Sequence, residues 1–393
     1  VLSGKSIDNK GTEEGFVIKL PKNMPNEKLY LHPEEEHTYD WTFTFGSPGR
    51  KDGANGAANI FDSVFVAGYS ENNKGIINSY IAKINLLDGK LKWEKNFQSK
   101  IKNKNSAFES ILKTSDQGLI LSGVTNSDKD SFEGFKSYGN PQSGETLVMF
   151  FDKKSLISDS PPTKPTWEIV IKDSTSGITI KEIINEKNYV IASKENKEDG
   201  ISKIIKIDDR GKTIWSKNYP NFGEITDLDM SSFNGKNDGI LISGHKKDKY
   251  GGIDGSMAKV SLDGSLIWNN TFGNPLGGIN KFSKIEIKNE KMVFDECWGI
   301  SSMGDGGAIM ACGTGIEECE FYQNNNKLFS QCLNDPRTTW RSLLIRVDKN
   351  GNKIWEHVDS FFFTGEDDDL PSTASEYVFI TKDKNIASVT DLG

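Results

Sequence analysis

Short runs in which apolar and polar residues alternate extend along almost the whole chain. Alternation with a period of two is the pattern of a β-strand that buries one face. Many of these runs are joined by Asp-Gly or Gly-Gly pairs such as Asp305-Gly306, which favour the tight turns of β-hairpins. The pattern therefore predicts an all-β protein made of antiparallel strands.

These runs form a repeat in which a strand leads to Asp and Gly and then, a few residues later, to Trp. Four copies show it plainly: Ile81–Trp93, Ile204–Trp215, Met257–Trp268 and Leu344–Trp355. The marker tryptophans of all repeats are Trp41, Trp93, Trp167, Trp215, Trp268 and Trp355, spaced by 52, 74, 48, 53 and 87 residues. A four-stranded unit that recurs about every 50 residues is typical of a β-propeller blade. The markers thus predict a six-bladed β-propeller of four-stranded antiparallel blades, with insertions in the second and fifth repeats.

The two ends of the chain predict how such a ring closes. The last repeat ends before its final strand, and residues 15–20 have the character of the missing one. We therefore expect an N-terminal strand at residues 15–20 to complete the last blade, which would leave no long unpaired edge. Residues 1–14 are expected to form a polar arm outside a single propeller domain of residues 15–393. Because the chain begins with Val1 rather than Met, we expect it to be processed or incompletely observed.

At these residues the chain resembles the Trp-containing propeller repeats of quinoprotein-like and related secreted proteins. The resemblance covers nearly the whole chain and implies a propeller fold and extracellular use. It carries over no catalytic residue, since the cofactor site of quinoprotein dehydrogenases has no counterpart that can be placed here. No cofactor is therefore expected, and the marker tryptophans are interpreted as core aromatics between blades.

All four cysteines fall in the fifth repeat: Cys297, Cys312, Cys319 and Cys332. An even, clustered count predicts two disulfides. If Asp305-Gly306 is the tip of a hairpin, Cys297 and Cys312 face each other across it within bonding distance. Cys319 and Cys332 would then clip the insertion at residues 313–340. The alternative, a metal site, lacks a CxxC pair and a nearby histidine, so disulfides and an oxidising, extracellular location are favoured.

Charge and composition exclude several classes of protein. The 48 Lys and Arg against 56 Asp and Glu give a net charge of −8, which disfavours nucleic acid and anionic membranes as partners. No apolar run approaches the roughly 18 residues that a membrane span needs. The acidic stretches Glu34–Glu36 and Glu366–Asp369 offer oxygen ligands for calcium, although neither has EF-hand spacing.

Two further kinds of site are candidates. Asn269-Asn270-Thr271 is the one N-glycosylation sequon, which makes Asn269 the candidate acceptor. Phe321, Tyr322 and Trp340 are candidate side chains for stacking on a sugar or another ligand. No GxSxG, P-loop or HExxH motif is present, so no catalytic residue is named.

Three functions are consistent with these features. The first is a secreted non-enzymatic scaffold or structural protein that mediates extracellular protein–protein assembly through self-association, with a filament as one form of it. The alternative is a carbohydrate- or ligand-binding propeller. The second alternative, a propeller hydrolase or oxidoreductase, rests on analogy of fold alone.

Overall fold

A computed structural model describes residues 1–7, 12–20, 40–128, 143–195, 201–247, 253–273, 293–316, 340–358 and 373–392. It divides the chain into two compact units, treated separately below. The N-terminal unit comprises Val1–Gly200 and Ile205–Ile214, and the C-terminal unit comprises Ile201–Ile204 and Trp215–Gly393. Within the described ranges the single helix, α1 (Lys153–Ile157), is far too short to cross a membrane.

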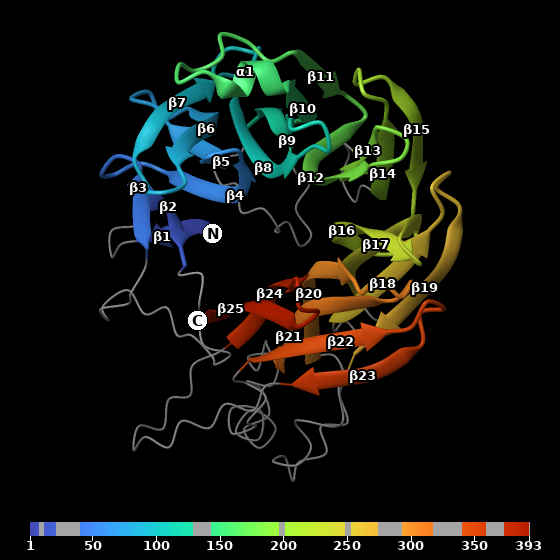
Figure 1. Ribbon diagram of the computed structural model, residues 1–393. Coiled ribbons are helices and arrows are strands. Elements are labelled where there is room, and N and C mark those ends of the chain that lie inside the picture. Colours follow the sequence, from blue (N-terminus) through green and yellow to red (C-terminus); the bar gives the residue numbers. More distant parts are fainter. Residues whose placement is uncertain are drawn as a thin grey trace, which may run out of the picture. The chain divides into compact units, whose positions relative to one another are not determined.

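The N-terminal unit consists of consecutive antiparallel sheets (Figure 1). A three-stranded sheet contains β1 (Leu2–Ile7), β2 (Glu13–Lys19) and β3 (Trp41–Phe45). The next sheet contains β4 (Asp52–Ile60), β5 (Ser63–Glu71), β6 (Ile77–Asn85) and β7 (Leu91–Phe97). It is followed by β8 (Asn105–Lys113), β9 (Leu119–Ser127), β10 (Glu145–Phe151) and β11 (Trp167–Ile171). The unit boundary runs through the last two strands of the next sheet, which contains β12 (Ser174–Ile183), β13 (Asn188–Glu195), β14 (Ser202–Ile207) and β15 (Thr213–Asn218).

The C-terminal unit repeats the same arrangement. Its first sheet contains β16 (Glu224–Phe233), β17 (Lys236–Lys247), β18 (Ile253–Val260) and β19 (Leu266–Phe272). Its second contains β20 (Val293–Ser302), β21 (Ala308–Ile316), β22 (Arg341–Val347) and β23 (Lys353–Val358). A single parallel bridge between Ile253 and Phe294 links the two. The last pair is β24 (Thr373–Ile380) and β25 (Ile386–Leu392). The expected all-β fold of repeated four-stranded antiparallel sheets is thus confirmed.

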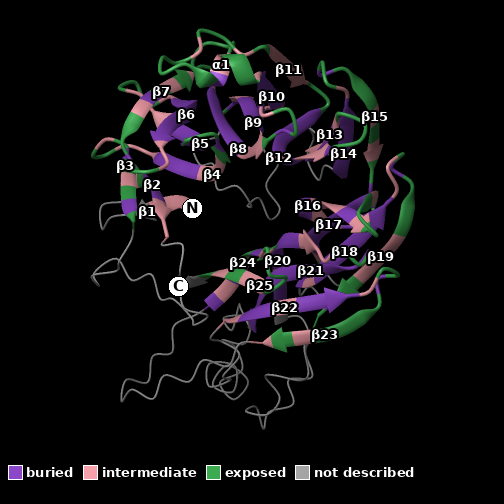
Figure 2. Cartoon of the chain, in the orientation of Figure 1, coloured by how far each residue is buried: buried purple, intermediate pink, exposed green. Residues whose placement is uncertain are grey.

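Within each unit, consecutive sheets pack face to face through fully buried side chains. In the N-terminal unit Phe65 and Ile81 of one sheet join Phe108 and Phe151 of the next in one cluster. In the C-terminal unit Met257 packs in the same manner with residues of β21 and β22. Figure 2 shows this burial on the inner strands and exposure on the outermost ones. Because each sheet hides both faces against neighbours, its middle strands are nearly continuous apolar runs.

The marker tryptophans link each sheet to the next by a recurring contact. Five indole N–H groups donate to a main-chain carbonyl of the following sheet: Trp41 to Leu86 at 3.0 Å, Trp93 to Ser158 at 3.3 Å, Trp167 to Asp209 at 3.0 Å, Trp215 to Leu262 at 3.3 Å, and Trp268 to Lys349 at 3.1 Å. In four of the five, a turn glycine with positive φ lies under the ring: Gly89, Gly211, Gly264 and Gly351. The Asp-Gly-to-Trp spacing of the repeat therefore encodes contacts between neighbouring sheets as well as within one.

Alanine in place of Gly351 is expected to destabilise the C-terminal unit by roughly 2–3 kcal/mol. The new Cβ would lie 2.7 Å from the Trp268 ring at a φ of 83°, so both the backbone and the ring contact are strained. Gly235→Ala is the matched control, because its φ of 75° is similar but nothing lies within 4 Å of the added Cβ. Denaturant unfolding should show a loss of only about 1 kcal/mol for that control. Equal losses in the two variants would contradict the role of the ring contact.

The structure differs from the expected N-terminal arrangement in two respects. Residues 2–7, expected in a free polar arm, form β1 and pair with β2 from Leu2–Ile18 to Ile7–Glu13. The strand at residues 15–20 is β2, but its two edges are occupied by β1 and β3 rather than by a strand of the last repeat. Gly4 is opposite Phe16 in this pairing, and its lack of a side chain leaves room for the Phe16 ring.

Candidate functional site

The first strand of each four-stranded sheet, and β24, carries a β-bulge at a corresponding position. The register shifts lie between Ala54 and Gly56, Phe108 and Ser110, Thr175 and Thr179, Ile225 and Asp227, Cys297 and Gly299, and Ser375 and Tyr377. A bulge leaves an extra residue outside the ladder and re-aims its side chain, and bulges are frequent next to functional sites. The bulge residues are therefore the candidate positions for a functional site.

In the N-terminal unit two neighbouring bulges bring an amide and a carboxyl group together. Asn55 Nδ2 donates to the Phe108 carbonyl at 2.8 Å and lies 3.5 Å from Glu109 Oε2. Glu109 is buried, and this desolvation raises the pKa of its carboxyl group to about 7. Glu109 is therefore partly protonated at neutral pH, a property that catalytic and binding carboxyls share with some structural ones.

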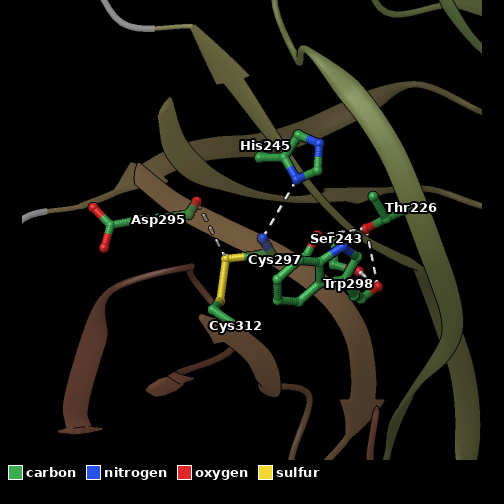
Figure 3. The surroundings of a disulfide bond; sticks show 7 residues. All are labelled: Thr226, Ser243, His245, Asp295, Cys297, Trp298 and Cys312. Carbon is green, nitrogen blue, oxygen red and sulfur yellow. Dashed lines mark hydrogen bonds between the residues drawn. A yellow bond between two sulfur atoms is a disulfide. The ribbon is translucent and has the colours of Figure 1, made fainter. Parts of the chain in front are cut away.

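The C-terminal unit joins its bulges in a similar way. Thr226 Oγ1 shares its proton between the carbonyls of Cys297 and Trp298, at 2.8 and 2.9 Å. Ser243 Oγ also donates to the Trp298 carbonyl, at 3.1 Å (Figure 3). Side chains from β16 and β17 thus satisfy carbonyls that the bulge in β20 releases from its own ladder.

The disulfide lies directly beside this bulge. Cys297 and Cys312 are opposite each other in the β20–β21 pairing, are joined by a disulfide, and are both fully buried (Figure 3). The pairing predicted from the hairpin tip at Asp305-Gly306 is confirmed. The register shifts by one residue between Cys297 and Gly299, on the tip side of the disulfide, and this bulge places Cys297 opposite Cys312 rather than Gly313.

His245, at the end of β17 in the neighbouring sheet, contacts the main chain of Cys297 beside the bulge. Its Nδ1 accepts a hydrogen bond from the Cys297 main-chain N–H at 3.4 Å, which assigns the proton of the neutral ring to Nε2. Burial lowers the pKa of His245 to about 3. The imidazole is therefore neutral at physiological pH and acts here as a hydrogen-bond acceptor for the bulge.

Trp340 is the one predicted stacking residue within the described part of the chain, and the backbone already covers part of its ring. The ring packs on two glycines of β21, because a Cβ at Gly313 or Gly315 would lie 2.8 or 2.7 Å from it. Trp340 is half-buried, and its carbonyl accepts the N–H of Thr373 at 3.0 Å. Its role in ligand stacking stays a prediction.

Asn269 lies in the outer strand β19, where its amide is already engaged. Asn269 Nδ2 donates to the Asn221 carbonyl at 3.2 Å. A glycan would replace one of the two hydrogens on that nitrogen, so occupancy stays a prediction. The other predicted site residues lie outside the described ranges: Cys319, Phe321, Tyr322, Cys332, and the acidic stretches Glu34–Glu36 and Glu366–Asp369.

Sequence reasoning missed a buried cation that recurs on the third strand of the sheets. Its members are Lys83, Lys206, Lys259 and Arg346. Lys259 Nζ contacts Asp238 Oδ2 at 2.7 Å, and Lys206 and Arg346 pair with Glu186 and Asp305. Lys83 lies 3.6 Å from Asp159 Oδ1 and also donates to three carbonyls at the end of α1. The sequence feature that could have predicted these buried cations is a lysine or arginine at an apolar position of the repeat, for example in Ile81-Ala-Lys-Ile84.

No protein-family model and no curated protein matches the chain. Solved structures are similar in fold at low identity. A europium-containing methanol dehydrogenase has a TM-score of 0.44 and 11% identity, covering 89% of this chain and 68% of that one. BamB from Moraxella catarrhalis has a TM-score of 0.37 and 10% identity, covering 88% of this chain and 83% of that one. The chain therefore has structural matches to PQQ-type and BamB-like β-propeller proteins, which concern the fold alone.

Proposed function

We propose that the protein is a secreted, non-enzymatic β-propeller scaffold that mediates extracellular protein–protein assembly by self-association. The proposal includes six blades in a closed ring, and the six marker tryptophans support that number of blades. The buried Cys297–Cys312 disulfide supports an oxidising compartment. A filament would follow if the contact between copies does not close on itself.

The observation that carries the proposal is the outer strand β19. Within the described residues it pairs only with β18, has no charged residue, and exposes Leu266 and Ile267 by 55% and 52%. Edge strands of monomeric proteins usually carry lysine, proline or a bulge that prevents pairing with another chain, and β19 has only a one-residue bulge at Ile267. An edge that combines free backbone groups with exposed apolar side chains suits strand addition by a second copy of this chain.

The outer strand β23 of the next sheet adds to this surface. Ile354 is 55% exposed, and Trp355 at 37% is the most exposed marker tryptophan. Within the described residues, Trp355 alone among the six has no indole hydrogen bond to a following sheet. Two neighbouring outer strands therefore offer apolar contacts to the partner.

Sedimentation velocity over a range of concentrations tests the proposal. The parent chain is expected to self-associate, and Ile267→Lys should weaken association at least tenfold, because burying one isoleucine contributes about 1.5–3 kcal/mol. Leu87→Lys is the control, since Leu87 is 83% exposed in a turn of the N-terminal unit. A parent chain that stays monomeric at every concentration would refute the proposed assembly.

A further inference from the structure

Two carboxylates approach each other where β18 and β20 meet. Asp254 and Asp295 each follow a residue of the single parallel bridge, Ile253–Phe294, that links the two sheets. A Cβ on Gly273, directly after β19, would lie 2.2 Å from Asp254 Oδ1 and 3.0 Å from Asp295 Oδ2. The two oxygens are therefore no more than about 5 Å apart. Asp295 is fully buried and Asp254 is half-buried, so the pair lies in a poorly solvated place.

A buried hydroxyl group lies on the same side of the sheet. Thr314 of β21 is directly opposite Asp295 in the β20–β21 register, so the two side chains share a face. Thr314 is fully buried, and its Oγ1 has no hydrogen-bond partner within the described residues. Because a buried hydroxyl without a partner is costly, such a group indicates a place for a bound species. This observation is independent of the two carboxylates.

We propose that Asp254, Asp295 and Thr314 bind a hard divalent cation of the calcium class. All three supply oxygen, the ligand atom that calcium prefers, and the ion would neutralise the two carboxylates. Two oxygens bound to one calcium ion are separated by about 5 Å at most, so the upper limit set by Gly273 allows both carboxylates to reach the same ion. No three His, Cys, Asp or Glu side chains converge on a metal position in the described ranges, so water and main-chain oxygens would complete the coordination.

The lack of a side chain at Gly273 is part of the proposed site. An alanine methyl group there would occupy the space that both carboxylates approach. The bound ion would also add a link between the two sheets at their parallel bridge. Calcium is therefore expected to stabilise the C-terminal unit, independently of any assembly through β19.

Calorimetric titration of chelator-treated full-length chain with calcium chloride tests the proposal, with thermal unfolding as a second readout. We expect one site that raises the unfolding midpoint and that loses at least tenfold in affinity in Asp254→Asn. The control is Asp263→Asn, which removes the same charge from an exposed turn of the same unit and should bind calcium like the parent. Asp254 is half-buried, so its substitution is better tolerated than that of Asp295.

Gly273→Ala gives a second test that leaves every charge in place. It should reduce calcium affinity while the unfolding midpoint in chelator stays close to that of the parent. The proposal is overturned if the parent binds no calcium, or if Asp254→Asn and Gly273→Ala both bind it as tightly as the parent does.

Discussion

Glutamine at position 109 is expected to stabilise the N-terminal unit at alkaline pH and to remove part of its pH dependence. Burial raises the pKa of the Glu109 carboxyl from its ordinary 4.5 to about 7. Between these two values the native state holds a proton that the unfolded chain has released. The contribution of protonated Glu109 to the free energy of unfolding is therefore fully present below about pH 4.5 and is lost as the pH rises through 7.

The expected size follows from the shift in pKa. At 1.36 kcal/mol for each pH unit, ionised Glu109 costs the native state about 3 kcal/mol above neutrality. Glu109→Gln has a similar shape, can still accept a hydrogen bond from Asn55, and has no charge to desolvate. The variant should exceed the parent in free energy of unfolding by up to about 3 kcal/mol at about pH 8.5, and match it at about pH 4.5.

Urea unfolding at several pH values measures this difference. Glu14→Gln is the control, because it makes the same substitution at an exposed position on β2 of the same unit. A gap between parent and Glu109→Gln that is constant with pH would show that the carboxyl does not titrate as its burial requires.

Removal of the disulfide is the second large effect. Cys297 and Cys312 are separated by 15 residues in sequence, and closing a loop of that length restricts the unfolded chain by roughly 3 kcal/mol. The paired Cys297→Ala and Cys312→Ala substitutions also remove two fully buried sulfur atoms from the cluster around Met257 and Met310. We therefore expect the C-terminal unit to lose about 3 kcal/mol or somewhat more.

Unfolding in guanidinium without reductant compares the double variant with the parent. Reductant present during unfolding should lower the midpoint of the parent further than that of the double variant. Both sulfurs are fully buried, so Cys297 and Cys312 should resist alkylation in the folded parent even with reductant present. An unchanged midpoint in the double variant would mean that the disulfide adds nothing to stability.

The disulfide could be predicted because the geometry of a hairpin is local. Once Asp305-Gly306 is placed at the tip, Cys297 lies opposite Cys312 or its neighbour Gly313, and the one-residue bulge beside Cys297 selects Cys312. The repeat could be read for the same reason, since each sheet needs the same alternation, the same turns and the same tryptophan. The pairing of residues 2–7 with β2 was not predicted, because the few apolar side chains of these residues give little strand signal.

The candidate sites depended on neighbours that are remote in sequence. Nothing in the sequence distinguishes Glu109 from the other acidic residues. Only the packing of its sheet against the next removes its carboxyl group from water. The closeness of Asp254 and Asp295 arises where two sheets meet, 41 positions apart in the chain. The bulges were not visible either, because an extra residue in a strand has no fixed side-chain signature.

The sequence by itself determined the all-β class, the four-stranded repeat, its tryptophan markers and the Cys297–Cys312 pairing. These depend on periodicity and on turns, which act over a few residues. Only the tertiary structure decided which polar groups lose contact with water and which come together. Burial is a property of packed sheet surfaces, and desolvation changes the charge state of a carboxyl group only after those surfaces have met.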